Sequence, residues 1–184
     1  MNIILASNSP RRKEILQKAG YKFEVIPSLY DENIQGLKYS AEIVINCACN
    51  KAFEVAKKNR KSLVIGADTV VVHKNRILGK PQNKIEAFEM LKTLSNDTHF
   101  VASAICLIHG MEIVKGIELT NVTFRELSDT DIMTYIKTRH PLDKAGSYGV
   151  QDEGFDFAIN IEGNLDNVIG FPMKLFDELL SECI

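Results

Sequence analysis

The chain has 184 residues, 45% of them hydrophobic and 25% charged, and we expect residues 1–184 to form a single compact domain. Its formal net charge of -2 argues against the broad basic surface that nucleic-acid polymers require, so no such partner is expected. Neither a secretory leader pattern nor an apolar run of about 18 residues is present, so we expect a cytoplasmic protein that binds no membrane.

The cysteines and histidines argue against two further kinds of site. The four cysteines lack the paired C-x-x-C spacing of a zinc site and are expected to be buried, reduced thiols. The four histidines form no H-E-x-x-H motif, and no G-x-S-x-G motif accompanies them, so a histidine-based hydrolase is not expected. These residues are Cys47, Cys49, Cys106, Cys183, His73, His99, His109 and His140.

The N-terminal segment predicts an anion site. Residues 2–5 form a short apolar strand, and Ser9 then caps a helix that ends after Ala19. Arg11 and Arg12 lie in the first turn of this helix, where free N–H groups and the positive end of the helix dipole favour phosphate. The alternative is an ordinary capped helix with a solvated basic turn, although basic residues there oppose the dipole.

The following segments place a second cation on a helix. A strand is expected over residues 21–26 and a polar loop over residues 27–37. Ser40 then caps a helix that ends near Lys58. Lys51 projects from this helix.

Residues 62–73 form a long β-rich run that Asp68 interrupts at its centre. A carboxylate among apolar strand residues is costly to bury unless it is paired, hydrogen-bonded or bound to a metal, and function is one possible reason for it. Alternation places Asp68 on the same face as Gly66, where a ligand can approach the backbone, and Thr69 on the opposite face. The alternative is a turn over residues 66–69 that divides the run into two short strands.

The second half of the chain mixes helices and strands without strict alternation. This order predicts an α/β or α+β domain with a mixed central β-sheet flanked by helices. The expected elements are a helix opened by Asn83 and Glu86 that ends at Leu94, a hairpin of strands 98–109 and 112–124, a helix from Ser128 to about Thr138, a loop over residues 143–156, a strand over residues 157–162 and a helix from about Met173.

Two loops carry further polar residues. Lys80 lies in a Gly-Lys-Pro loop after the long strand, where it either returns over Asp68 or is simply solvated. Residues 143–151 include Lys144, Gln151 and two glycines that permit close contact with a ligand. Taken together, the charged residues have the composition of a metal-assisted polyphosphate site, namely Arg11, Arg12, Lys51, Lys80, Lys144, Glu32 and Asp68.

Six ordered segments, covering nearly the whole chain, resemble the Maf family of nucleoside triphosphate pyrophosphatases. The resemblance implies hydrolysis between the α and β phosphates of a nucleotide, on a fold similar to inosine-triphosphate pyrophosphatases. Two of the segments, residues 66–71 and 143–151, look like the branch that acts on dTTP and UTP. The six segments are residues 7–16, 51–52, 66–71, 79–81, 143–151 and 167–172.

The resemblance also implies what individual residues do. Asp68 would accept the proton of the attacking water and, with Glu32, bind a divalent metal cation, Mg²⁺ or Mn²⁺. The other positions would bind the substrate. Its phosphates would be held by Arg12, Lys51 and Lys80. Its identity would be selected at Arg11, Thr69 and Gln151, and further contacts would come from Ser7, Ser9 and Lys144.

Two wider expectations come from the same resemblance. The protein is expected to be a homodimer that removes dTTP, UTP or modified pyrimidine nucleotides from the nucleotide pool. The alternative, which the family name carries, is a nucleotide-binding regulator of septum formation or cell division that acts through a partner.

Overall fold

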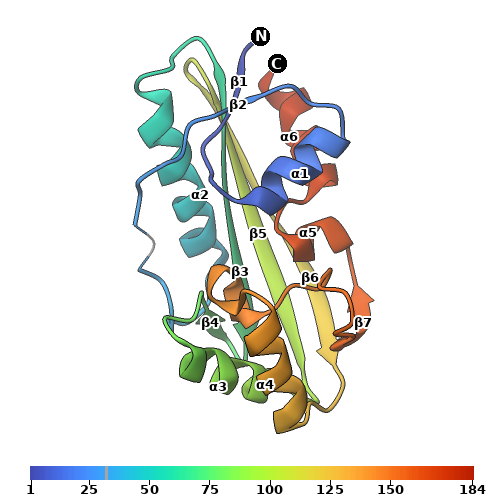
Figure 1. Ribbon diagram of the computed structural model, residues 1–184. Helices are drawn as coiled ribbons and strands as arrows, with labels where there is room; N and C mark the ends of the chain where they lie inside the picture. The colour runs from blue at the N-terminus through green and yellow to red at the C-terminus, as the bar shows by residue number, and fades with distance from the viewer. Residues whose placement is uncertain (32) are drawn as a thin grey trace.

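The computed structural model describes residues 1–31 and 33–184 (Figure 1). Its strands are β1 (Ile3–Leu5), β2 (Glu24–Val25), β3 (Leu63–His73), β4 (Arg76–Leu78), β5 (Thr98–His109), β6 (Glu112–Phe124) and β7 (Ala158–Glu162). Its helices are α1 (Pro10–Lys18), α2 (Ala41–Ala56), α3 (Lys84–Leu94), α4 (Asp129–Thr138), α5 (Leu165–Ile169) and α6 (Met173–Cys183), with 3-10 turns η1 (Pro141–Asp143) and η2 (Ala145–Ser147).

The described strands form one mixed sheet. Their order is β2-β1-β3-β5-β6-β7, and β4 also pairs with β3. β1 runs parallel to β2 and β3, whereas the pairs β3–β5, β5–β6 and β6–β7 are antiparallel. The predicted fold class, a mixed central sheet flanked by helices, is confirmed, and the β5–β6 hairpin has the predicted boundaries.

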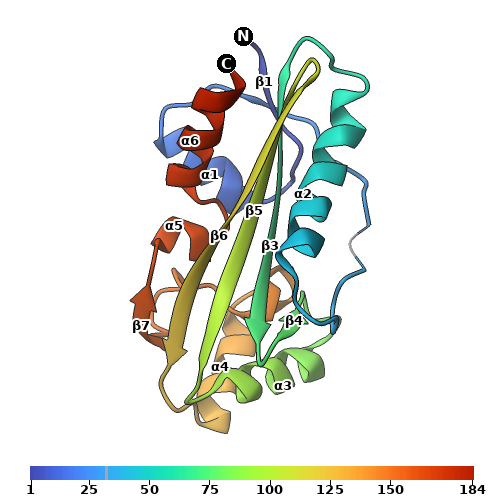
Figure 2. The ribbon, with the colours of Figure 1, turned by 180° about the vertical axis from the view of Figure 1, so that it is seen from behind.

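Helices cover both faces of the sheet. α2 packs on one face of β3 and β5, and α1, α5 and α6 lie over the other (Figures 1 and 2). α3 and α4 cover the end of this second face near β4. On β3, Ala67 belongs to the apolar core under α1 and α6, and Val71 belongs to the core under α3 and α4. Thr69 lies on the same face between these two cores.

One edge of β3 is only partly paired. β5 accompanies β3 along nearly its whole length on one side. On the other side, β1 pairs with residues 63–65 and β4 with residues 71–73. Within the described part of the chain, residues 66–70 therefore have no strand neighbour at that edge. The Ala67 carbonyl accepts hydrogen bonds there from Arg12 Nη1 at 2.9 Å and Lys51 Nζ at 3.3 Å.

Local capping explains where several helices begin. The Ser9 side chain accepts a hydrogen bond from the Arg12 amide at the start of α1, as predicted. Asn83 caps α3, and Ser128 forms a capping box with Asp131 at the start of α4. Ser40 is the N-cap residue of α2, as predicted, but its side chain makes no capping hydrogen bond.

Four features of the sheet and its connections differ from the sequence prediction. The strand predicted over residues 21–26 is reduced to β2, because short β1 offers it only two partners. β4 was not predicted. Lys74 and Asn75 adopt positive φ angles in the tight turn that joins β3 to β4, and the two strands pair across this turn. α5 was also missed, since five residues are too few to show a helical period. The alternative turn over residues 66–69 is wrong, because β3 is continuous.

The structure also bears on the predictions about cysteines and membrane-spanning segments. All four cysteines are free and buried, which confirms their prediction as buried thiols. Among the described helices, none combines the length and apolar composition needed to cross a bilayer.

Gly66 allows α2 to pack closely against β3. A Cβ atom at this position would lie 2.2 Å from the Ala48 carbonyl oxygen and 2.8 Å from Ala52 Cβ. Both are far below van der Waals contact, so a side chain here requires the helix to move away from the strand. The same approach places Lys51 beside β3.

We expect Gly66→Ala to lower the free energy of unfolding by about 3 kcal/mol, because it overpacks this helix–strand contact. Urea denaturation measures the effect. Gly20→Ala is the control: its Cβ would face open space at φ +84°, so only about 1 kcal/mol of backbone strain is expected. Equal losses in the two variants would contradict the packing argument.

Candidate active site

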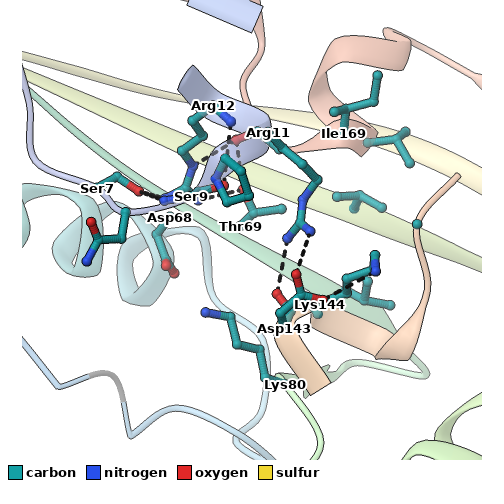
Figure 3. Close-up of a pocket in the computed structure, with 18 of the residues that line it drawn as sticks. Ser7, Ser9, Arg11, Arg12, Asp68, Thr69, Lys80, Asp143, Lys144 and Ile169 are labelled. Carbon is teal, nitrogen blue, oxygen red and sulfur yellow. Dashed lines mark hydrogen bonds and ion pairs between the residues drawn. The ribbon is translucent and has the colours of Figure 1, made fainter. Parts of the chain in front are cut away.

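A cavity of about 370 Å³ opens beside the partly paired edge of β3. Every described residue that the sequence predicted for the site lines this cavity, although the residues come from distant parts of the chain (Figure 3). They are Ser7, Ser9, Arg11, Arg12, Lys51, Asp68, Thr69, Lys80, Lys144 and Gln151. Glu32, predicted as a metal ligand, lies outside the described residues.

Asp68 and Lys51 form a buried ion pair at the cavity wall. Lys51 Nζ lies 2.8 Å from Asp68 Oδ1, and the two side chains are 9% and 2% exposed. Lys51 also donates to the Ala67 carbonyl. Burying either charge alone would cost several kcal/mol, so each compensates the other. Pairing, hydrogen bonding and metal binding were the expected ways to bury a carboxylate in β3; the structure shows a hydrogen-bonded ion pair, on the α2 side of the sheet.

Arg12 ties three segments together beneath the cavity. Its Nε donates to the Gly170 carbonyl at 3.0 Å, Nη1 to Ser7 Oγ at 3.1 Å and the Ala67 carbonyl, and Nη2 to Thr69 Oγ1 at 3.1 Å. The residue is 8% exposed. Arg12 thus fixes α1 against β3 and the end of α5. Its predicted contact with phosphate remains a prediction.

Arg11 lies at the cavity mouth instead. Its Nη1 is 3.4 Å from Asp143 Oδ2, and its Nη2 donates to the Asp143 carbonyl at 3.1 Å. Figure 3 shows these two bonds joining the start of α1 to η1 across the mouth. The two arginines that are adjacent in sequence therefore have different surroundings: one is a buried clamp and one borders the opening.

Two lysines approach the cavity from loops. Lys80 is exposed and extends from the loop after β4 into the space beside Asp68 (Figure 3). Lys144 is buried, and its ammonium donates to the His140 carbonyl at 2.9 Å and lies 3.6 Å from Asp152 Oδ2. Lys80 thus presents its charge to the cavity, whereas Lys144 holds its own loop together.

Part of the cavity wall is uncharged. Val150, Val168 and Ile169 contribute to its wall together with Tyr148. The Tyr148 hydroxyl lies 2.7 Å from His99 Nε2, and burial lowers the pKa of His99 to about 4, so the histidine is neutral near pH 7. Burial also raises the pKa of Tyr148. These residues therefore offer uncharged surface to a ligand.

Sequence reasoning missed part of this wall. Val168 and Ile169 belong to α5, and Tyr30 follows β2; none was proposed as a site residue. Apolar residues in a five-residue helix carry no local signal of function. Their position becomes evident only through the Gly170 carbonyl, which accepts from Arg12 and from Thr69 at 3.2 Å.

The charge of the cavity favours an anionic ligand. Five cationic side chains line it among the described residues, against the carboxylates of Asp68 and Asp143. No group of three or more His, Cys, Asp and Glu residues that could hold a metal ion by itself occurs in the described ranges. The surroundings suit a ligand that combines a polyphosphate with an uncharged ring.

Comparison with known proteins shows the family. The family model for Maf-like protein matches residues 2–183. A dTTP/UTP pyrophosphatase of Bacillus anthracis is 47% identical over 172 residues, which cover 94% of this chain and 90% of that protein. A dTTP/UTP pyrophosphatase of Bacillus cereus (strain G9842) is 46% identical over 178 residues, covering 96% and 93%.

Solved structures show the same fold at low sequence identity. The Staphylococcus aureus Ham1 protein has a TM-score of 0.55 at 15% identity, and a HAM1 protein from Coxiella burnetii has 0.54 at 13%. Each likeness covers 99% of both chains. These structures support the fold alone. The family match and the identity of the curated relatives together show that this chain belongs to the Maf family.

Proposed function

We propose that this protein hydrolyses dTTP and UTP to the nucleoside monophosphate and pyrophosphate. The observation that carries the proposal is the Asp68–Lys51 pair, buried at the wall of a cavity with further cationic side chains. The names of the relatives, dTTP/UTP pyrophosphatase, support both the reaction and the substrates.

Asp68 is the group that accepts the proton of the attacking water in this proposal. A carboxylate suits this role when it is held rigidly beside the reacting atoms. Lys51 fixes Asp68 Oδ1, and β3 fixes the backbone on both sides of it. The proton moves from water to the carboxylate as the water oxygen attacks phosphorus, and pyrophosphate is the leaving group.

The cationic side chains offset the repulsion between the triphosphate and the attacking oxygen. At an effective dielectric constant of about 20, opposite unit charges about 4 Å apart attract by about 4 kcal/mol. Lys51 and Lys80 line the cavity together with Asp68, and the N-terminus of α1 lines the same cavity. We propose that they bind the phosphates together with Ser7 and Ser9, while Arg12 acts mainly through its buried charge.

A divalent cation fits this site if the substrate shares it. Mg²⁺ in nucleotide enzymes is usually bound by one or two carboxylates together with substrate phosphates and water. Asp68 is a suitable carboxylate among the described residues, and the predicted second ligand is Glu32. When bound, the ion would neutralise phosphate charge and help to orient the triphosphate.

The part of the cavity wall formed by Val150, Val168 and Ile169 is the proposed place of the base. Gln151 is exposed and lines the cavity near Val150. Its amide has a donor and an acceptor, which match the N–H and carbonyl edge of uracil or thymine. Thr69 and Arg11 border the same space, which supports their predicted part in substrate choice.

We expect Asp68→Asn to lower kcat for pyrophosphate release from dTTP by about 100-fold or more, because the amide keeps the shape but cannot accept the proton. Release is measured with Mg²⁺ and with Mn²⁺. Asp177→Asn is the control, since Asp177 is bonded to Tyr21 away from the cavity. Near-normal kcat in a folded Asp68→Asn protein would exclude this role.

We expect Gln151→Ala to lower the preference for UTP over CTP, measured as the ratio of kcat/KM values, by about tenfold. The reason is that a truncated side chain leaves the base edge without its paired hydrogen bonds. The kcat for UTP should change less than this ratio. An equal loss of kcat/KM for every nucleotide would argue against a role in base selection.

A further inference from the structure

Tyr135 is a buried residue outside the cavity wall whose hydroxyl reaches the loop behind it. The residue is fully buried in α4, and its ring packs against Phe155 and Phe157 with centroid distances of 5.0 and 5.1 Å. Apolar packing accounts for the burial of the ring. It does not account for the burial of the hydroxyl, because a buried hydroxyl requires hydrogen-bond partners. Those partners lie in the segment that carries Gln151.

The Tyr135 hydroxyl binds both ends of one turn. It accepts a hydrogen bond from the Gly149 amide at 2.9 Å and donates one to Asp152 Oδ2. The Asp152 amide in turn donates to the Gly149 carbonyl at 3.0 Å, which closes a four-residue turn. Gln151 is the third residue of this turn. The Tyr135 hydroxyl therefore holds Gly149 and Asp152, the first and last residues of the turn that carries Gln151.

Lys144 and Gly149 complete the same packed unit. Lys144 Nζ lies 3.6 Å from the Asp152 oxygen that accepts from Tyr135. A Cβ atom on Gly149 would lie 2.8 Å from that oxygen and 2.9 Å from Lys144 Cε. Only a glycine lets the turn approach both side chains this closely. The arrangement links α4 to two predicted substrate-binding positions, Lys144 and Gln151.

The hydroxyl keeps its proton over the usual pH range. Burial, followed by the hydrogen bond to Asp152, raises the pKa of Tyr135 above its ordinary value. The hydroxyl thus remains a donor to Asp152 and an acceptor from Gly149 whenever the protein is folded.

Resting on the proposed function, we infer that Tyr135 is a positioning residue for base selection, which acts by holding the Gly149–Asp152 turn and thus the Gln151 amide. Neither Tyr135 nor Asp152 is among the described residues that line the cavity, so the effect passes through the turn. The position of the Gln151 amide relative to a base edge depends on the backbone that carries it. A turn held at both ends keeps that amide within hydrogen-bond reach of the N–H and carbonyl edge of uracil, whereas a loosened turn weakens this contact.

Tyr135→Phe tests this inference, because it removes the hydroxyl and keeps the ring. We expect the UTP:CTP ratio of kcat/KM to fall by about tenfold, mainly through KM, while kcat for UTP stays within about twofold. Tyr21→Phe is the matched control: it also removes a tyrosine–aspartate hydrogen bond, from Tyr21 to Asp177 at 2.8 Å, but away from the cavity. An unchanged ratio in Tyr135→Phe would overturn the inference. An equal fall of kcat for both nucleotides would also overturn it.

Amide hydrogen exchange provides a test that is independent of activity. The Gly149 and Asp152 amides should exchange about tenfold faster in Tyr135→Phe than in wild type, whereas amides in β3 and β5 should not change. Unchanged exchange at Gly149 would overturn the inference even if catalysis changed. If the wild-type protein hydrolysed no nucleotide, the proposed function would fail, and faster exchange would still support the anchoring of the turn.

Asp152→Ala provides a second route, should Tyr135→Phe not fold. This substitution removes the partly exposed carboxylate that accepts the hydrogen bond of the Tyr135 hydroxyl. We expect the UTP:CTP ratio of kcat/KM to fall by the same factor of about ten. Adding Tyr135→Phe to Asp152→Ala should then change the ratio by less than about twofold, since both act through one turn. Fully additive losses would contradict a shared route.

Discussion

A charged pair buried at an unpaired strand edge is the constraint on which the rest of the structure depends. Asp68 is almost completely inaccessible, and removing an ion from water costs several kcal/mol unless a partner is near. Lys51 provides that partner only because α2 packs closely against β3, and Gly66 makes this approach possible. The arrangement of one helix against one strand therefore determines whether the carboxylate can exist as a charge inside the protein.

The same edge explains why Arg12 of α1 and Lys51 of α2 meet there. A strand edge without a neighbouring strand leaves backbone carbonyls that need donors. The Ala67 carbonyl accepts from both Arg12 and Lys51, so two cationic side chains replace the missing strand. Sheet pairing by β1 and β4 is interrupted over residues 66–70, and the cavity that Asp68 lines lies beside this interruption. The part of β3 whose carbonyl needs hydrogen-bond donors is thus also the part that carries Asp68, the proposed proton acceptor.

The polar residues divide into those that build the site and those that face its opening. The Arg12 and Lys144 side chains donate hydrogen bonds to other groups of the protein, whereas Lys80 and Gln151 are exposed at the cavity. This division favours catalysis because preorganised charges need not rearrange when the substrate arrives. The Tyr135 hydroxyl extends the same principle to the turn that carries Gln151.

Sequence reasoning found the elements that local chemistry determines. Ser9, Asn83 and Ser128 mark helix starts because each side chain binds amides of the turn that follows. It missed β4 and α5, whose few residues show no period and depend on β3 and Arg12 for their place. It gave Arg11 and Arg12 different roles only through the family resemblance, and it could not show that Arg12 is the buried one, because tertiary packing decides this.

The candidate site was predictable in membership but not in arrangement. Motifs from the six segments named ten residues that line the cavity, but not the apolar part of its wall. No spacing in the sequence indicates that Asp152 returns to Tyr135. Such contacts arise between a helix and a loop that are joined by irregular backbone, and their geometry is set by packing. Sequence patterns therefore identified the chemical groups, and the fold supplied their orientation.

The most direct test of the central claim is to identify the products that the purified wild-type protein forms from dTTP and UTP in the presence of Mg²⁺. The account predicts the nucleoside monophosphate and pyrophosphate in equal amounts. Formation of a nucleoside diphosphate and phosphate, or recovery of both nucleotides intact, would contradict it.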